Sequence, residues 1–366
     1  MSYLSPYDGH VHLRGEEYAE HKFLKLAFRD ALVVGLCGLT EEPNPKPHLI
    51  DWKAIEPRIK EVDHYRGEIF HGMNIGLTHN RDQVIKAIKL AKKSQESAEN
   101  LWEKRIVGDK TYYVDSTGNM GIKNNDEQLR NWKIRQQNRY TGVSKGHFED
   151  EDSFKGEFDY QKPITHSLRQ NPESELIQVE RQIKYATDTK FQGTFVIAHT
   201  SNPDTIDFVE EVRRKQRRKA SPLNIKMEMT WHHMLLNWND YAHHKNRVKM
   251  NPPLRDQKMQ ERNLEAVLVG RIDFIVTDHA PHPLERKDSS EPPSGIPEIA
   301  FWPQGIRLLR KFGIDEELLQ KITCLNTLET FKIPIKPRIV NVTYNPELWT
   351  AYGYNPFSRI DQKYGI

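Results

Sequence analysis

The stretch YDGHVHLR, from Tyr7 to Arg14, places two histidines one residue apart and an arginine two residues after the second. Residues i and i+2 of a β-strand point to the same side, so His10, His12 and Arg14 are expected to line one surface together. Two imidazoles held close together suit a metal ion, and a guanidinium beside them suits an anion. Histidines with this spacing also occur in cores and on surfaces, so the meaning of the stretch depends on partners elsewhere in the chain.

Short apolar runs with β-forming residues recur after this stretch, and amphipathic helical patterns lie between several of them. The runs are ALVVGLCGL from Ala31, EIFHGMNIGL from Glu68, KTYYVDS from Lys110, KPITHS from Lys162, GTFVIAHTS from Gly193, IKMEMTWHH from Ile225 and DFIVTDHAPH from Asp273. Together with the opening stretch they alternate with helices about eight times, which is typical of an α/β protein with a (β/α)8 TIM barrel. In such barrels the active site lies at the carboxyl ends of the strands.

The length of 366 residues fits one barrel domain over residues 1–366. One polar segment, about 118–161, interrupts the compact spacing. We expect a surface excursion there, with a short helix in its first part, rather than a separate domain. Residues from about 337 to 366 are expected to form a C-terminal tail.

Charge and composition restrict the class of partner. The 54 basic and 51 acidic residues give a net charge of +3, so nothing favours nucleic acid or a membrane surface. No run approaches the roughly 20 apolar residues of a membrane span. Two cysteines and no apparent leader predict a reducing cytoplasm without disulfides.

Further polar residues fall at the expected strand ends. His166, His199 and Asp278 end the fifth, sixth and eighth runs. Four histidines and an aspartate can hold two divalent ions if an anion bridges them. A lysine ammonium has no lone pair for a metal, but a lysine carbamylated by CO2 carries a carboxylate, and Lys110 could serve in this way. The alternative for Lys110 is an ion pair inside the barrel.

Six motifs in this order resemble those of the dihydroorotases of the metal-dependent amidohydrolase superfamily. They are DGHVHLR, KTYYVDSTGN, VIAHTS, MNPPLR, TDHAPH and GIP, and they extend over nearly the whole chain. The resemblance implies an amidohydrolase-type barrel. Many members flank this barrel with a β-sandwich built from both termini, and the short segment before Tyr7 predicts little or none of it here.

The resemblance also implies a role for each matching residue. His10 and His12 would bind a buried metal, carbamylated Lys110 would bridge to a second metal, and His166 and His199 would bind that second metal, with zinc expected at both places. Asp278 would bind the first metal and act as general acid and base. Arg14, Asn44 and His282 would hold the substrate carboxylate. Asn251 and the backbone near Gly295 and Pro297 would line the pyrimidine pocket.

The implied reaction is the reversible hydrolysis of dihydroorotate to carbamoyl aspartate in pyrimidine biosynthesis, through a hydroxide that bridges the two metals. Two divalent ions would lower the pKa of that water towards ~7, and Asp278 would carry the proton between water and ring nitrogen. The partner would be a small molecule, with a homodimer open as an assembly. Alternatives are another cyclic amidase, such as a hydantoinase or allantoinase, and a catalytically silent partner subunit. For Arg14, the alternative is an ion pair with Glu16 or Glu17 at the barrel rim.

The remaining histidines are expected to have structural roles. His232 and His233 are interpreted as a packed pair, His243 and His244 as surface residues and His71 as a core residue. His279 is expected to orient a neighbour without binding a metal.

Overall fold

The computed structural model describes residues 1–65, 67–96, 105–115, 118–219 and 223–365. Its centre is an eight-stranded parallel sheet whose strands lie side by side in chain order. The strands are β2 (Tyr7–Val11), β3 (Gly38–Glu41), β4 (Phe70–Gly76), β5 (Ile106–Tyr112), β6 (Val143–His147), β7 (Thr194–Ile197), β8 (Asn224–Thr230) and β9 (Phe274–Val276). The first and last strands meet where the amide of His12 donates to the carbonyl of His279 over 2.7 Å. The sheet therefore closes into the predicted barrel.

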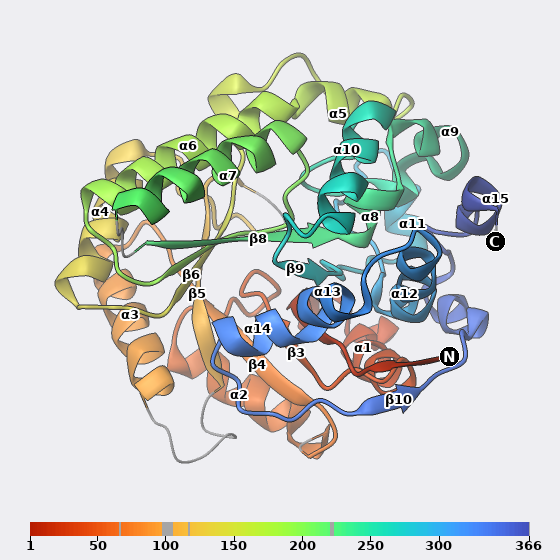
Figure 1. Ribbon diagram of the computed structural model, residues 1–366, viewed down its shortest axis with the longest axis horizontal. Helices are drawn as coiled ribbons and strands as arrows, with labels where there is room; N and C mark the ends of the chain where they lie inside the picture. Colours follow the sequence, from red (N-terminus) through yellow and green to blue (C-terminus); the bar gives the residue numbers. More distant parts are fainter. Residues whose placement is uncertain (66, 97–104, 116–117, 220–222, 366) are drawn as a thin grey trace.

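Helices surround the barrel (Figure 1). The longer ones are α1 (Phe23–Val33), α2 (Trp52–Val62), α3 (Arg81–Glu96), α4 (Asn125–Gln137), α6 (Pro172–Asp188), α7 (Pro203–Lys219), α10 (Gln257–Leu268) and α12 (Trp302–Lys311). The shorter ones are α5 (Ile164–Arg169), α8 (Trp231–Leu235), α9 (Tyr241–His244), α11 (Leu284–Lys287), α13 (Glu316–Gln320), α14 (Asn326–Thr330) and α15 (Ile360–Tyr364). The 3-10 turns are η1 (Glu16–His21), η2 (Asp63–Tyr65), η4 (Glu151–Ser153), η5 (Trp238–Asp240), η6 (Lys245–Val248), η7 (Ile299–Phe301) and η9 (Pro346–Tyr352), and η8 (Lys321–Leu325) is a π-helical turn. Among the described residues, no helix is both long enough and apolar enough to span a bilayer.

The start of α6 shows how the sequence sets a helix boundary. The Asn171 side chain accepts a hydrogen bond from the amide of Ser174, and Pro172 occupies the first turn, where its missing N–H costs nothing. Glu173 and Glu175 add negative charge at the positive end of the helix dipole. The helix then buries a stripe that includes Val179, spaced for packing against the barrel.

The amino-terminal half of the barrel is filled by apolar side chains. They belong to one cluster of Tyr7, Phe70, Val107, Val143, Val196, Phe274 and Val276, together with Cys324, Leu328, Phe331 and Ile333 from η8, α14 and the residues after it. This packed layer closes the lower end of the barrel, so polar chemistry is confined to the opposite end.

The fifth strand is not the one predicted. The run KPITHS from Lys162 was expected as a strand, but its apolar residues lie on the short helix α5. The fifth strand is β6, VSKGH, which lies inside the supposed polar excursion, as does helix α4. Residues 118–161 therefore contain a central strand of the barrel. The polar strand is stable when buried because Lys145 forms ion pairs with Glu42 and Glu228, and the Ser144 hydroxyl donates to Asp109.

The second strand is also displaced from the predicted run. Ala31 to Val33 end helix α1, and the strand begins only at Gly38. The termini carry a small separate sheet, in which β1 (Ser2–Leu4) pairs antiparallel with β10 (Ile339–Asn341). In Figure 1 this pair lies at the outside of the barrel.

Candidate metal and substrate site

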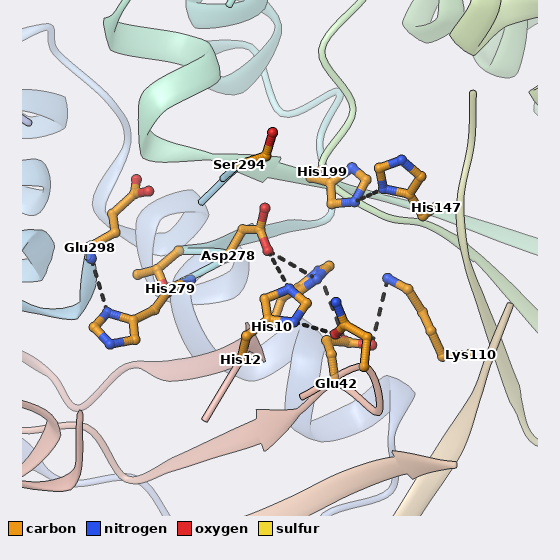
Figure 2. Close-up of polar contacts among 12 residues, drawn as sticks. His10, His12, Glu42, Lys110, His147, His199, Asp278, His279, Ser294 and Glu298 are labelled. Carbon is orange, nitrogen blue, oxygen red and sulfur yellow. Dashed lines mark hydrogen bonds and ion pairs between the residues drawn. The ribbon is translucent and has the colours of Figure 1, made fainter. Parts of the chain in front are cut away.

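His10, His12 and Asp278 meet at the carboxyl ends of the first and last barrel strands (Figure 2). Asp278 Oδ1 lies 3.3 Å from His10 Nε2 and 2.7 Å from His12 Nε2. One ligand atom from each residue lies within 4.8 Å of the others, and all three side chains are buried. The structure thus brings together the two histidines of the opening stretch and the predicted aspartate.

Hydrogen bonds on the far side of each ring decide which nitrogen faces this cluster. His10 Nδ1 donates to Glu228 Oε2 over 2.8 Å, and His12 Nδ1 donates to Asn44 Oδ1 over 2.5 Å. Burial lowers the pKa of both histidines, that of His12 to about 3, so both rings are neutral. Their Nε2 lone pairs therefore point at the Asp278 carboxylate, and His10 Nε2 has no hydrogen-bond partner within the described chain. Lone pairs facing a carboxylate repel it, and a divalent cation among them would remove the repulsion, so these residues fit a metal.

A second pair of nitrogens lies on the adjacent strands. His147, the last residue of β6, places its Nδ1 2.9 Å from His199 Nε2 (Figure 2). His147 Nε2 donates to Glu149 Oε2 over 2.9 Å, so its Nδ1 carries the lone pair. Carboxylates often orient ligating histidines in this way. Burial lowers the pKa of His199 well below its usual value, which keeps this ring neutral as well.

His147 takes the place that the sequence analysis gave to His166. His166 lies on α5, and its Nε2 contacts the Met250 carbonyl at 2.9 Å and Asn251 Oδ1 at 3.0 Å. Its assignment as a metal ligand is therefore wrong, because the predicted strand that carried it does not exist. The stretch HFED after Lys145 was the available signal, since a histidine two residues before an acid suits a ligand with its orienting carboxylate.

His199 and Asp278 both have left-handed backbone conformations, with φ of 35° and 53°. This region costs residues other than glycine roughly 1 kcal/mol or more, and such conformations concentrate at functional sites. Each residue lies two positions after the end of its strand, where the turn directs the side chain across the barrel mouth.

Lys110 is fully buried on β5, and its Nζ has no hydrogen-bond partner among the described residues. Glu42 Oε2 lies 3.6 Å away (Figure 2). Burial lowers the pKa of Lys110 below its usual value, which increases the fraction of neutral amine. A neutral amine is the form that reacts with CO2, so the setting is compatible with both the predicted carbamate and the alternative ion pair.

Lys145 anchors a charged layer directly beneath the site. Its Nζ donates to the Gly9 carbonyl over 2.8 Å and to Glu42 Oε1 over 2.7 Å, and it pairs with Glu228 Oε1 at 2.6 Å. All three side chains are buried, and burial raises the pKa of Glu228 to about 7. Since Glu228 orients His10, this layer holds a site residue in place. The sequence analysis missed it, although an acid inside the apolar run IKMEMTWHH was a signal.

Arg14 follows the end of β2 by three residues and is buried, and it lines the same cavity as the two histidines. Its Nε donates to the Pro281 carbonyl over 3.2 Å, and its Nη2 lies 3.0 Å from His282 Nε2. Glu17 Oε1 is 3.6 Å from Nη1, so part of the alternative rim ion pair is present, while the side chain of Glu16 lies outside the described structure. Nη1 has no hydrogen-bond partner among the described residues, although it is buried.

A cavity joins these groups. Its lining consists of His10, His12, Arg14, Asn44, Tyr112, His147, His199, Asn251, Asp278, Ala280, Ser294 and Gly295. Asn44 Oδ1 accepts from the Tyr112 hydroxyl over 2.9 Å as well as from His12. Gly295 has φ of 129°, and a Cβ there would lie 2.5 Å from the Ala280 carbonyl oxygen, so only glycine fits. His282 is not among the lining residues, but its Nε2 contacts two of them, Arg14 Nη2 at 3.0 Å and the Ser294 carbonyl at 2.9 Å.

Most of the other histidines lie as interpreted from the sequence, but His244, which was interpreted as a surface residue, is half-buried. The rings of His232 and His233 pack with centroids 4.3 Å apart, and His232 Nδ1 donates to Glu298. His71 is buried against Glu41, and His243 is exposed. His279 Nδ1 accepts from the amide of Glu298 over 3.0 Å, and Figure 2 shows this ring turned away from the His10 cluster.

The chain is similar in sequence to dihydroorotases. It is 26% identical to that of Halobacterium salinarum over 91% of this chain and 72% of the relative, and 26% identical to that of Methanosphaera stadtmanae over 91% and 71%. No family model matches the chain.

Solved structures share the fold. The L-hydantoinase of Arthrobacter aurescens aligns over 94% of this chain and 75% of its own with a TM-score of 0.76 and 18% identity. The dihydroorotase of Saccharomyces cerevisiae, in complex with 5-fluoroorotic acid, aligns over 92% and 85% with a TM-score of 0.70 and 17% identity.

The likeness to these structures confirms the TIM-barrel fold, which is that of the amidohydrolases among them. In sequence, the relatives that match over most of the chain are dihydroorotases, at 24–26% identity.

Proposed function

We propose that this protein catalyses the reversible hydrolysis of dihydroorotate to carbamoyl aspartate, the dihydroorotase step of pyrimidine biosynthesis. One observation carries the proposal beyond the family. A buried arginine, whose Nη1 makes no hydrogen bond among the described residues and has Glu17 Oε1 3.6 Å away, lines the same cavity as the histidine and aspartate cluster. The cavity therefore offers a carboxylate site beside a hydrolytic one, as a ring amide that carries a carboxylate requires.

Two divalent ions, with zinc as the expected metal, belong to this proposal. His10, His12 and Asp278 would hold one ion, and His147 and His199 would hold the other, with Lys110 as a carbamate between them. The matching of lone pairs and donors in both clusters supports this assignment. When bound, such ions polarise the amide carbonyl and make water more acidic.

The chain's own residues carry the proton and the orientation. Burial raises the pKa of Asp278 to about 6, so its carboxylate exchanges a proton readily near neutral pH. In the hydrolytic direction, Asp278 takes a proton from the attacking water and gives it to the ring nitrogen as the C–N bond breaks. In the reverse direction, it removes the proton from the ureido nitrogen as the ring closes.

Arg14 fixes the substrate relative to Asp278. Its Nη1 can donate to the ring carboxylate, while Nε and Nη2 hold the guanidinium against Pro281 and His282. Asn44 Oδ1 is occupied by His12 and Tyr112, so this oxygen orients the metal-side ring rather than the substrate. The contribution of Asn44 to a carboxylate clamp would come from its amide nitrogen.

Hydantoinases are the main rival class, since their fold is shared. Hydantoin and dihydrouracil lack the carboxylate that Arg14 would bind, so they would leave the buried Nη1 of Arg14 without a hydrogen-bond acceptor. A silent partner subunit is disfavoured because the histidines, the lysine and the aspartate all converge on one cavity.

The proposal is tested by following dihydroorotate consumption in the ultraviolet with purified, metal-replete protein. Hydantoin and dihydrouracil serve as matched substrates without the carboxylate. We expect efficient turnover of dihydroorotate alone. Turnover of hydantoin with none of dihydroorotate would refute the proposed substrate.

A cytoplasmic location and a homodimer are the remaining parts of the proposal, because the reaction supplies nucleotide synthesis inside the cell. Cell fractionation and light scattering on the purified chain test these two points.

A further inference from the structure

His166 does not bind the metal cluster, but it is buried and makes two contacts at the edge of the cavity. It lies on α5 between β6 and α6, and Asn251 lies between β8 and α10. A third loop, between β9 and α12, brings Ser294 to the same point. His166 Nε2 and Ser294 Oγ each lie 3.0 Å from Asn251 Oδ1.

The direction of these hydrogen bonds follows from the atoms around them. A backbone carbonyl only accepts, so the 2.9 Å contact with the Met250 carbonyl requires that His166 Nε2 carries its proton. That same N–H also faces Asn251, and the Asn251 atom facing it must therefore be the oxygen. His166 is thus a donor to Asn251 Oδ1, and the orientation of the carboxamide follows.

The hydrogen bonds of Ser294 indicate the same orientation of the Asn251 carboxamide. Lys249 Nζ donates to Ser294 Oγ over 2.8 Å, so this oxygen accepts from Lys249 and its own proton points to Asn251 Oδ1. Two donors from different loops consequently hold the Asn251 oxygen. No hydrogen bond among the described residues involves Asn251 Nδ2, and Asn251 lines the cavity.

We propose that His166 and Ser294 are positioning residues for the substrate, and that they fix the Asn251 carboxamide so that its N–H2 group donates to a carbonyl oxygen of the bound ring. The inference rests on the proposed function, because it requires a substrate with a ring carbonyl in this cavity. The inference assigns His166 to recognition of the substrate ring. It predicts that the site discriminates against rings that carry a hydrogen-bond donor in place of the carbonyl oxygen that Asn251 would bind.

His166→Phe and His166→Gln separate this role from the alternatives. Phenylalanine keeps the ring volume and removes the donor, whereas the glutamine amide nitrogen can take the place of Nε2. Ser167→Ala is the matched control, because Ser167 is the neighbouring buried residue on α5 and its hydroxyl bonds Leu254 and Tyr241 outside the cavity. KM and kcat for dihydroorotate, the dissociation constant for 5-fluoroorotate by calorimetry, bound metal and thermal stability are measured for each.

We expect His166→Phe to raise KM and the 5-fluoroorotate dissociation constant about fivefold to tenfold, the range for one lost hydrogen bond. Metal content should be unchanged, His166→Gln should recover to within about twofold, and Ser167→Ala should leave KM unchanged. In an Asn251→Ala background, His166→Phe should have no further effect on KM, because the group that it positions is gone.

Loss of metal in His166→Phe, or a wild-type KM in an active His166→Phe protein, would overturn the inference while leaving the proposed function intact. A wild-type protein that does not turn over dihydroorotate would instead overturn the proposed function. If His166→Phe does not fold, Ser294→Ala provides the same test, with a smaller rise in KM expected and an unchanged KM counting against the inference.

Discussion

Replacing Lys145 with methionine tests the charged layer under the site. The change keeps most of the side-chain volume and removes the ammonium, which contacts Gly9, Glu42 and Glu228 within 2.8 Å. All three charged side chains are fully buried, so the two carboxylates would be left with Lys110, whose Nζ lies 3.6 Å from Glu42 Oε2, as their neighbouring cation. Breaking a buried pair by removing one partner typically costs about 3–5 kcal/mol. We expect Lys145→Met to lower the free energy of unfolding by this amount.

The loss should depend on pH. Burial already raises the pKa of Glu228 to about 7, and without Lys145 that pKa rises further. A carboxyl group whose folded pKa is raised loses stability as pH increases from its unfolded pKa, about 4.3, through the folded value. The difference between wild type and Lys145→Met should therefore be small near pH 5 and largest above pH 8.

Urea unfolding at pH 5, 7 and 8.5, with and without metal, measures the effect. Lys226→Met is the control, because Lys226 lies on the same strand as Glu228 and pairs with Asp273 at 2.9 Å in a partly exposed position. Such a pair is worth about 1 kcal/mol or less. A Lys145→Met protein within 1 kcal/mol of wild type at pH 8.5 would refute the role of Lys145 in holding the layer together.

Three further variants test the site itself. Arg14→Lys keeps the charge but loses the planar fork, so kcat/KM for dihydroorotate should fall at least about tenfold with metal content unchanged; dihydrouracil turnover that falls equally would argue against a carboxylate clamp. Asp278→Asn should retain most bound metal while turnover falls by roughly 10²–10⁴-fold, as measured by metal analysis and the ultraviolet assay. Near-normal turnover of this variant would exclude Asp278 as the proton carrier. Lys110→Ala should lose metal and activity together, with partial rescue by short carboxylic acids, and full metal occupancy in an active variant would contradict the bridge.

The sequence predicted the parts of the site that lie on clearly patterned strands. The spacing of His10, His12 and Arg14 placed all three on one side of a strand, and their side chains do line one cavity. The same rule would also place Asp8 on that side. The register between β2 and β3 shifts between Asp8 and Val11, and Asp8 instead bonds Thr277 and Trp302 behind the sheet. A bulge changes which residues share a face, and only the partner strand shows it.

Tertiary structure alone decided the fifth strand and, with it, His147. VSKGH reads as polar because Lys145 and Ser144 lie within it, and strand patterns are recognised from apolar residues. The ammonium of Lys145 can be buried because Glu42 and Glu228, which are far away in the sequence, form ion pairs with it. A sequence lists each charge separately, whereas the cost of burying a charge depends on its partners in space. By itself the sequence determined a barrel with histidines, an aspartate and an arginine at one end, and the folded chain determined which histidine joins them.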